Sequence, residues 1–198
     1  MIKYPNGQPY LEGKKKEKHN KKSKKDISIS SANRGMDFES DINLSNDYYR
    51  SKGICLVYKR PTPINVVKVD YSRGAMITHA YFEAQSTTDY NGVYKGKYLD
   101  FEAKNTKNKT SFPLSNITTH QIEHLKQVIF HEGIAFFIVQ FETLGKVFLL
   151  DASYVIHFYE KGDRKSIPLN CFIENGIEIE KAYNPRLKYI EAVEKKYF

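Results

Sequence analysis

The stretch Asp100-Phe101-Glu102-Ala103-Lys104 decides how this chain is interpreted. Side chains alternate between the two faces of a β-strand, so Asp100, Glu102 and Lys104 would share one face and the two apolar residues the other. Charged residues are poor strand formers, so a strand that gathers them on one face is unusual. Two carboxylates beside an ammonium suit a hard cation such as Mg²⁺ and charge that develops on a phosphoryl group. A solvent-facing ladder of ion pairs would explain the same residues without a function.

The residues before this stretch predict a hairpin that adds a third carboxylate. Aromatic and β-branched residues surround two turn signals, Asn91-Gly92 and Lys95-Gly96. If the chain reverses at the second signal, Asp89 lies opposite Glu102, with Thr87 two residues earlier on the same strand. Like charges in directly opposed positions, with Cβ atoms ~5 Å apart, destabilise a hairpin unless something neutralises them. A divalent cation would do so, whereas a turn at the first signal would break this register.

Residues 118–129 are predicted to form a helix that points a polar amide at the sheet. The apolar stripe of this helix consists of Ile122, Leu125, Val128 and Ile129. Gln121 falls within that stripe. It could close a capping box with Thr118, or its side chain could reach a metal ion or the ion's water shell, and both can hold.

The same helix matches the H-x-x-E-H pattern of one class of zinc peptidases through His120, Glu123 and His124. All three residues are predicted to lie on the flank that faces solvent, away from the apolar stripe. The sequence offers no third protein ligand for such a zinc ion, so we do not favour a zinc site.

Length, charge and composition bound the class of protein. The 198 residues suit one domain, and the net charge of +8 with a pI near 9.2 indicates a polyanionic partner. Cys55 and Cys171 lack metal-ligand spacing and are predicted to be buried, reduced thiols. The chain has no apolar run long enough to span a membrane, and its Lys-rich start lacks the hydrophobic segment of a signal peptide. No phosphate-cradling glycine loop or dinucleotide fingerprint is present, so a nucleotide cofactor is not expected.

Two segments differ from the rest of the chain. Residues 1–31 contain eight lysines between positions 14 and 25 among polar neighbours, which is typical of a disordered basic arm that contacts DNA or serves as a solubilising tail. Residues from about 64 to 86 alternate as two strands, 66–71 and 76–82, and are too long for an ordinary loop.

The remaining elements follow from hydrophobic periodicity. Helices are predicted at about residues 34–51, at 152–159 and after Pro185. Strands are predicted at residues 54–58, 134–141 and 146–150.

Blocks of sequence along nearly the whole chain resemble the RecU family of bacterial Holliday junction resolvases. The blocks of the predicted site are residues 86–92, 94–96, 100–104 and 106–114. Further blocks are residues 1–7, 33–36, 61–63, 120–124, 162–167 and 197–198.

The resemblance implies an α/β fold of the restriction-endonuclease-like type: a mixed sheet flanked by helices, with the D…(D/E)-x-K signature and a protruding β-stalk at about residues 64–86. Residues 32–198 would form this nuclease domain, which works as a homodimer with one metal site per subunit. The cofactor would be Mg²⁺, for which Mn²⁺ could substitute. The metal site implied by the resemblance consists of Thr87, Asp89, Glu102 and Gln121.

Three further residues receive roles from the resemblance. Lys104 corresponds to the residue that stabilises the transition state. Asp100 is acidic in the family too, and its role as a catalytic or a structural residue stays open. Glu39 matches an acidic residue on the first helix of such nucleases, or it is a surface carboxylate at the edge of that helix's apolar stripe.

Basic residues are candidates for DNA contacts, because the family's stalk enters the centre of a four-way junction. Each of them could instead be a solvated surface charge. The candidates are Lys59, Arg60, Lys68, Arg73, Arg164 and Lys165.

The sequence is therefore interpreted as a Mg²⁺-dependent endonuclease that nicks paired strands of four-way DNA junctions during recombination and repair. Strand annealing and modulation of a recombinase are further roles that the resemblance implies, with recombinase and branch-migration proteins as partners. The expected location is the cytoplasm, at the nucleoid. A restriction-type nuclease on duplex DNA and a non-catalytic DNA-binding or strand-annealing protein are the alternatives.

Deleting residues 1–31 tests the two interpretations of the arm. If the arm contacts phosphates, the truncated chain binds DNA more weakly and with a flatter dependence on salt, because fewer counterions are released. Filter binding at several salt concentrations measures this slope. An unchanged slope would favour the solubilising tail.

Overall fold

The computed structural model describes residues 31–83 and 87–198, and side chains within the first helix from residue 38 onward. The predicted basic arm lies outside the described residues up to residue 30. The body of the chain, Ser31–Phe198, forms one compact unit.

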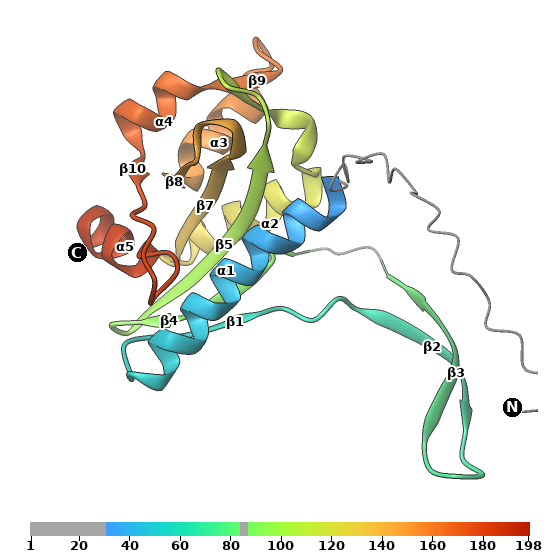
Figure 1. The fold of residues 1–198 in the computed structure, drawn as a ribbon. Coiled ribbons are helices and arrows are strands. Elements are labelled where there is room, and N and C mark those ends of the chain that lie inside the picture. Colours follow the sequence, from blue (N-terminus) through green and yellow to red (C-terminus); the bar gives the residue numbers. More distant parts are fainter. Residues whose placement is uncertain (1–30, 84–86) are drawn as a thin grey trace, which may run out of the picture. The chain divides into compact units, whose positions relative to one another are not determined.

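A six-stranded sheet is the centre of this body (Figure 1), and it is mixed, as the family resemblance implied. All neighbouring strands are antiparallel except β5 and β7, which are parallel. In spatial order the strands are β1 (Leu56–Lys59), β4 (Tyr90–Tyr94), β5 (Lys97–Thr106), β7 (Ile134–Phe141), β8 (Lys146–Asp151) and β10 (Ile177–Glu178).

Helices cover both faces of the sheet, and the sheet divides the hydrophobic core into two layers. On one face, α1 (Ser31–Ser51) and α5 (Tyr189–Tyr197) pack with the apolar side chains of the first layer, which include Phe101 and Phe136. On the other face lie α2 (Thr119–Phe130), α3 (Ala152–Lys161) and α4 (Leu169–Asn175). Alternation along β7 explains the division, because Phe136 belongs to the first layer and Phe137 to the second.

The hairpin between β4 and β5 has the predicted register. The chain reverses at Lys95-Gly96, both with positive φ, of 46° and 75°. Such a pair is typical of the two-residue turns that match the twist of a hairpin. Tyr90 pairs with Phe101 and Tyr94 with Lys97, so the expected pairing continues from the turn to the edge of the predicted site.

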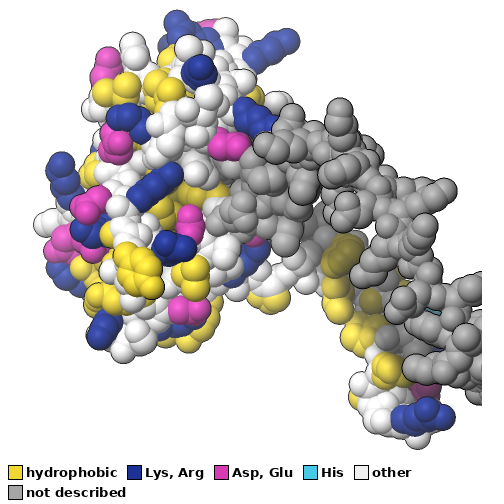
Figure 2. Space-filling view, viewed as in Figure 1, with side chains coloured by type: hydrophobic (Ala, Val, Ile, Leu, Met, Phe, Trp, Pro, Cys, Tyr) yellow, Lys and Arg dark blue, Asp and Glu magenta, His cyan; other side chains and the backbone are white. Residues whose placement is uncertain are grey.

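A separate two-stranded sheet occupies the predicted insertion, with β2 (Ile64–Asp70) and β3 (Met76–Phe82) in antiparallel pairing. Its side chains are mostly exposed, including Val67 at 66% and Phe82 at 77%, and Figure 2 shows hydrophobic side chains at the surface of this hairpin. An exposed hairpin of this length agrees with the expected stalk.

Several short elements were not predicted. They are η1 (Leu114–Asn116), η2 (Glu142–Leu144), α4, β10 and the small sheet of β6 (Ser111–Pro113) and β9 (Ser166–Pro168). The observed first strand, β1, begins two residues later than predicted, and α1 begins three residues earlier. Across residues 31–83 and 87–198, the structure contains no helix with the length and apolar character needed to cross a membrane.

Gly92 permits the close pairing of β1 with β4. A Cβ atom on Gly92 would lie 2.0 Å from the main-chain oxygen of Leu56 and 2.6 Å from the Cα of Val57. Both contacts are to backbone, so they cannot be relieved by a side-chain rotation.

We therefore expect Gly92→Ala to lower the free energy of unfolding by about 1–3 kcal/mol, the usual cost of overpacking. Urea denaturation followed by circular dichroism measures this change. Val93→Ala is a matched control on the same strand, because Val93 is 46% exposed. Equal effects of the two substitutions would contradict the steric explanation.

Candidate active site

The charged face of β5 turns inward toward α2. Asp100 and Glu102 are fully buried, and the Lys104 side chain is 20% exposed. Phe101 and Ala103 point to the opposite layer of the core. The predicted alternation is thus confirmed, and the alternative of a solvent-facing ladder of ion pairs is wrong because both carboxylates are buried.

Glu102 has polar partners on both carboxylate oxygens. Its Oε1 accepts a hydrogen bond from Gln121 Nε2 at 2.5 Å and lies 2.6 Å from the ammonium of Lys104. Its Oε2 accepts from the main-chain N–H of Asp89 at 3.1 Å. Burial raises the pKa of Glu102 to about 8, with Lys104 acting to lower it and the nearby Asp89 to raise it further.

Asp89 lies directly before β4 and opposite Glu102, as predicted. Its side chain is half-buried, and its Oδ2 accepts a hydrogen bond from the main-chain N–H of Ala103 at 3.2 Å. The two acidic residues are therefore fixed by main-chain hydrogen bonds between the residue before β4 and β5. Thr87 is half-buried two residues earlier, and its role stays a prediction.

Gln121 forms the capping box that the sequence offered as one of its two roles, and its contact with a metal ion stays a prediction. Its main-chain N–H and side-chain Oε1 form a capping box with Thr118, at 3.4 and 3.0 Å. Its Nε2 meets Glu102, so the amide does point into the carboxylate cluster. The cap fixes the side chain that reaches the cluster.

A second cluster surrounds Asp100. Its Oδ2 accepts hydrogen bonds from Arg60 at 2.6 Å, Tyr98 at 2.9 Å and His124 at 3.0 Å, and its Oδ1 accepts from Thr88. A buried carboxylate needs such partners, because an unpaired buried charge is strongly destabilising.

Two predictions about α2, for His124 and for Ile129, are wrong. His124 was predicted to face solvent together with His120 and Glu123, but only the latter two are exposed, because α2 packs closely enough on β5 for His124 to reach Asp100. Ile129 was assigned to the apolar stripe, yet it is 39% exposed near the end of the helix.

Of the remaining predicted residues, Arg60 belongs to the second cluster and the others lie at the surface. Glu39 forms an exposed ion pair with Lys59. Arg60 is mostly buried and bound to Asp100. The other basic candidates are exposed, and they are Lys68, Arg73, Arg164 and Lys165. The catalytic role of Glu39 and the DNA contacts of the basic residues stay predictions.

The first cluster has the chemistry of a site for a hard divalent cation. Carboxylate, amide and hydroxyl oxygens are the ligands that Mg²⁺ takes. Burial raises the pKa of Glu102, so a cation beside it would favour the ionised carboxylate. Among the described residues, no three His, Cys, Asp or Glu side chains are grouped as a metal site. The candidate ligands that the structure brings together are two carboxylates, Asp89 and Glu102, and metal binding by Thr87 and Gln121 stays a prediction.

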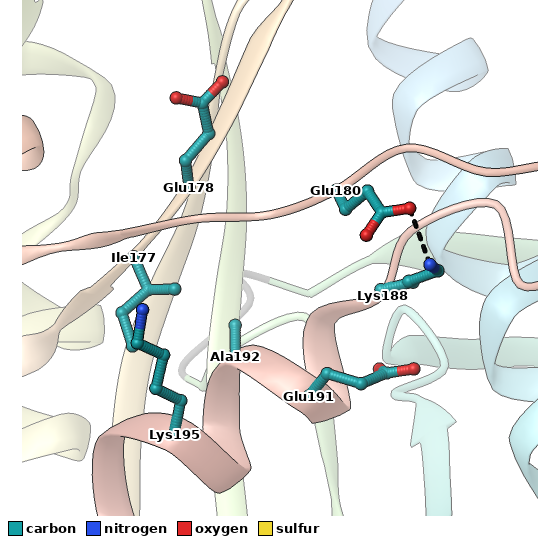
Figure 3. Close-up of a pocket in the computed structure, with 7 residues that line it drawn as sticks. All are labelled: Ile177, Glu178, Glu180, Lys188, Glu191, Ala192 and Lys195. Carbon is teal, nitrogen blue, oxygen red and sulfur yellow. Dashed lines mark hydrogen bonds and ion pairs between the residues drawn. The ribbon is translucent and has the colours of Figure 1, made fainter.

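A pocket of about 330 Å³ lies elsewhere, between β10 and α5 (Figure 3). The ion pair of Glu180 with Lys188 crosses its rim, and Lys195 and Ile177 also line it. None of its lining residues belongs to either carboxylate cluster, so it is not the candidate active site.

Sequence reasoning missed Tyr98, Thr88 and His124 as partners of Asp100. Two weak signals could have found them: Tyr98 lies two residues before Asp100 on the same face of β5, and His124 lies one turn after Gln121. The contact of Thr88 had no local signal.

Comparisons with known proteins point in one direction. The family described as Recombination protein U matches residues 33–195. A relative from Geobacillus sp. (strain WCH70) named Holliday junction resolvase RecU is 50% identical over 203 residues, which cover 100% of this chain and 98% of that protein. A relative of the same name from Geobacillus kaustophilus is 48% identical over 202 residues, with the same coverage.

One solved structure, that of the Holliday junction resolvase Hjc from Archaeoglobus fulgidus, matches more weakly. It is 12% identical, with a TM-score of 0.43, and the match covers 72% of this chain and 94% of that one. A likeness at this level supports no statement about this chain.

The raised pKa of Glu102 predicts a pH-dependent stability in the absence of metal. The pKa of this carboxyl is about 4.3 in the unfolded chain and about 8 in the folded chain. The folded state therefore binds more protons between these values, so the contribution of Glu102 to stability falls as the pH rises toward 8. Each unit of pKa difference corresponds to roughly 1.4 kcal/mol.

We expect Glu102→Gln to gain stability relative to the parent chain between pH 5 and pH 9, by a few kcal/mol. Urea denaturation in a chelator at both pH values measures the difference, and Glu178→Gln, at an exposed ion pair, serves as the control. A difference that is the same at both pH values would show that Glu102 is not buried with a raised pKa.

Proposed function

The chain belongs to the Recombination protein U family, and on that premise we propose that it is a divalent-metal-dependent endonuclease that resolves four-way DNA junctions in recombination and repair. The observation that carries this proposal is the buried cluster of Asp89, Glu102, Gln121 and Lys104. The names of the relatives supply the substrate class.

Asp89 and Glu102 would hold the cation, with Thr87 as a further oxygen donor, and Mg²⁺ or Mn²⁺ fits such a set. Gln121 would offer its Oε1 only after its side-chain amide turns over, because in the structure that oxygen accepts from Thr118 and the NH₂ group faces Glu102. When bound, such an ion supplies Lewis acidity toward a phosphate and lowers the pKa of water. The hairpin register keeps the two carboxylates opposed, and the capping box of α2 holds the amide beside them.

Lys104 would act on the phosphodiester itself. Its ammonium is mostly buried beside Glu102, on the strand face that the carboxylates share. A fixed positive charge in such a place stabilises the negative charge that develops on the phosphate oxygens during attack. The ion pair with Glu102 holds this ammonium on the side of β5 where the phosphate would lie.

Substrate binding would rest on exposed basic residues. Lys68 and Arg73 belong to the β2–β3 hairpin, and Arg164 and Lys165 precede β9. A net charge of +8 supports contact with phosphate backbones. We also propose a homodimer, because a junction has near two-fold symmetry and needs two paired cuts. Strand annealing and binding to a recombinase belong to the same proposal, as does a place at the nucleoid.

A nicking assay on a synthetic mobile four-way junction tests this function, with linear duplex as control and with Mg²⁺ present or removed by chelator. We expect metal-dependent nicks at symmetric positions in the junction and none in the duplex. Cleavage of the duplex would instead indicate a restriction-type nuclease, and binding without cleavage would indicate a non-catalytic DNA-binding protein.

Lys104→Ala tests the assigned role of the ammonium. The variant should bind junctions as the parent does but cleave them at least about 100-fold more slowly, because it lacks only the charge that acts in the transition state. Gel-shift binding and single-turnover cleavage measure the two quantities. Lys146→Ala, which removes an exposed ion pair, should cleave normally. Normal cleavage by Lys104→Ala would contradict the role.

A further inference from the structure

Asp100 is a second buried carboxylate on β5, two residues from Glu102, and the proposed reaction does not account for it. Its four hydrogen bonds come from protein donors on four separate parts of the chain. Thr88 precedes β4, Tyr98 is on β5 itself, His124 is on α2, and Arg60 directly follows β1.

These donors leave Asp100 poorly suited to bind a cation. Three of the four hydrogen bonds fall on Oδ2, and two of their donors, Arg60 and His124, also contact each other at 3.3 Å. A cation at Oδ2 would have to replace the guanidinium of Arg60. Glu102 has protein donors on both oxygens too, but it faces Asp89, a second carboxylate that would share a cation with it.

Arg60 links this cluster to the candidate metal site. Its main-chain N–H donates to the main-chain oxygen of Asp89 at 2.8 Å, while its guanidinium binds Asp100 and the hydroxyl of Tyr98. The residue lies between the end of β1 and the start of the β2–β3 hairpin. The main chain of Arg60 therefore connects the start of the insertion to Asp89, and its side chain connects it to Asp100 on β5.

We propose that Asp100, Arg60 and His124 form a positioning cluster for the nuclease reaction, in which Asp100 binds no metal. The cluster fixes Arg60, and Arg60 fixes the main chain of Asp89 and with it the carboxylate beside Glu102. This inference rests on the proposed function. It also changes the role of Arg60, which the sequence assigned to DNA contact.

Metal binding separates a positioning role from a ligand role. Mn²⁺ alone is titrated into the full-length protein without DNA, and free Mn²⁺ is followed by electron paramagnetic resonance. We expect Asp100→Asn to bind Mn²⁺ within about 5-fold of the parent, whereas Glu102→Gln loses about 100-fold or more. Loss of binding in Asp100→Asn equal to that in Glu102→Gln would overturn the proposal.

Kinetics separates a positioning role from a purely structural one. Single-turnover cleavage of bound junctions is measured well below each variant's unfolding temperature, with saturating metal. We expect Asp100→Asn and Arg60→Ala each to cleave about 10- to 100-fold more slowly, because a shift of about 1 Å in a reacting group has effects of this size. Cleavage by both variants at the parent rate would overturn the proposal.

Two further results complete the test. The double variant Arg60→Ala/Asp100→Asn should cleave no more than about 3-fold more slowly than the slower single variant, because both residues act through one cluster. A double variant whose rate loss equals the product of the two single losses would overturn the proposal. Junction affinity in a chelator should stay unchanged in Arg60→Ala. If affinity falls while the single-turnover rate does not, Arg60 is a DNA contact and the proposal fails.

The test remains decisive if one variant does not fold or if the parent does not cut junctions. His124→Ala, which removes one of the donors to Asp100, takes the place of an unfolded Asp100→Asn in the kinetic comparison. In the Mn²⁺ titration, Arg60→Ala then replaces the unfolded Asp100→Asn. If Arg60→Ala loses Mn²⁺ binding as completely as Glu102→Gln does, the positioning role is overturned. A parent chain that cuts no junction contradicts the proposed function, while the Mn²⁺ titration still decides whether Asp100 is a ligand.

Discussion

The opposition of Asp89 and Glu102 across the β4–β5 hairpin is the constraint on which the site depends. Two carboxylates, a buried one on Glu102 and a half-buried one on Asp89, are brought together at the end of the hairpin away from its turn, and burial raises the pKa of Glu102 to about 8. The arrangement is tolerated because both carboxylate oxygens of Glu102 have polar partners. Lys104 and Gln121 contact Oε1, and the main-chain N–H of Asp89 donates to Oε2. The electrostatic cost of burying Glu102 beside Asp89 depends on these neighbours. The register of the turn at Lys95-Gly96 places the two carboxylates opposite each other, so the geometry of the site depends on that turn.

The opposite face of the same strands is apolar and keeps that register. The rings of Tyr90 and Phe101 stack with centroids 4.9 Å apart, and those of Phe101 and Phe136 with centroids 4.7 Å apart. This row crosses β4, β5 and β7 beneath α1. A slip of one residue in β5 would turn Phe101 toward α2 and Glu102 into the aromatic layer, so the core and the site specify the same pairing.

Local patterns predicted most of the sheet and the first cluster, because alternation, turn residues and a capping box act over a few residues. The turn at Lys95-Gly96 was enough to place Asp89 opposite Glu102. The second cluster was not predicted, since Arg60, Asp100 and His124 are brought together by the packing of α2 and the end of β1 on β5. The short strands β6, β9 and β10 carry too few residues for any periodicity to identify them.

The two clusters divide the charged face of β5 between chemistry at Glu102 and support at Asp100. Diffraction from crystals soaked in Mn²⁺, with data collected at the manganese absorption edge, tests this division most directly. The anomalous signal is expected beside Asp89 and Glu102, with Asp100 still bound to Arg60. A manganese ion coordinated by Asp100, or bound away from Glu102, would contradict it.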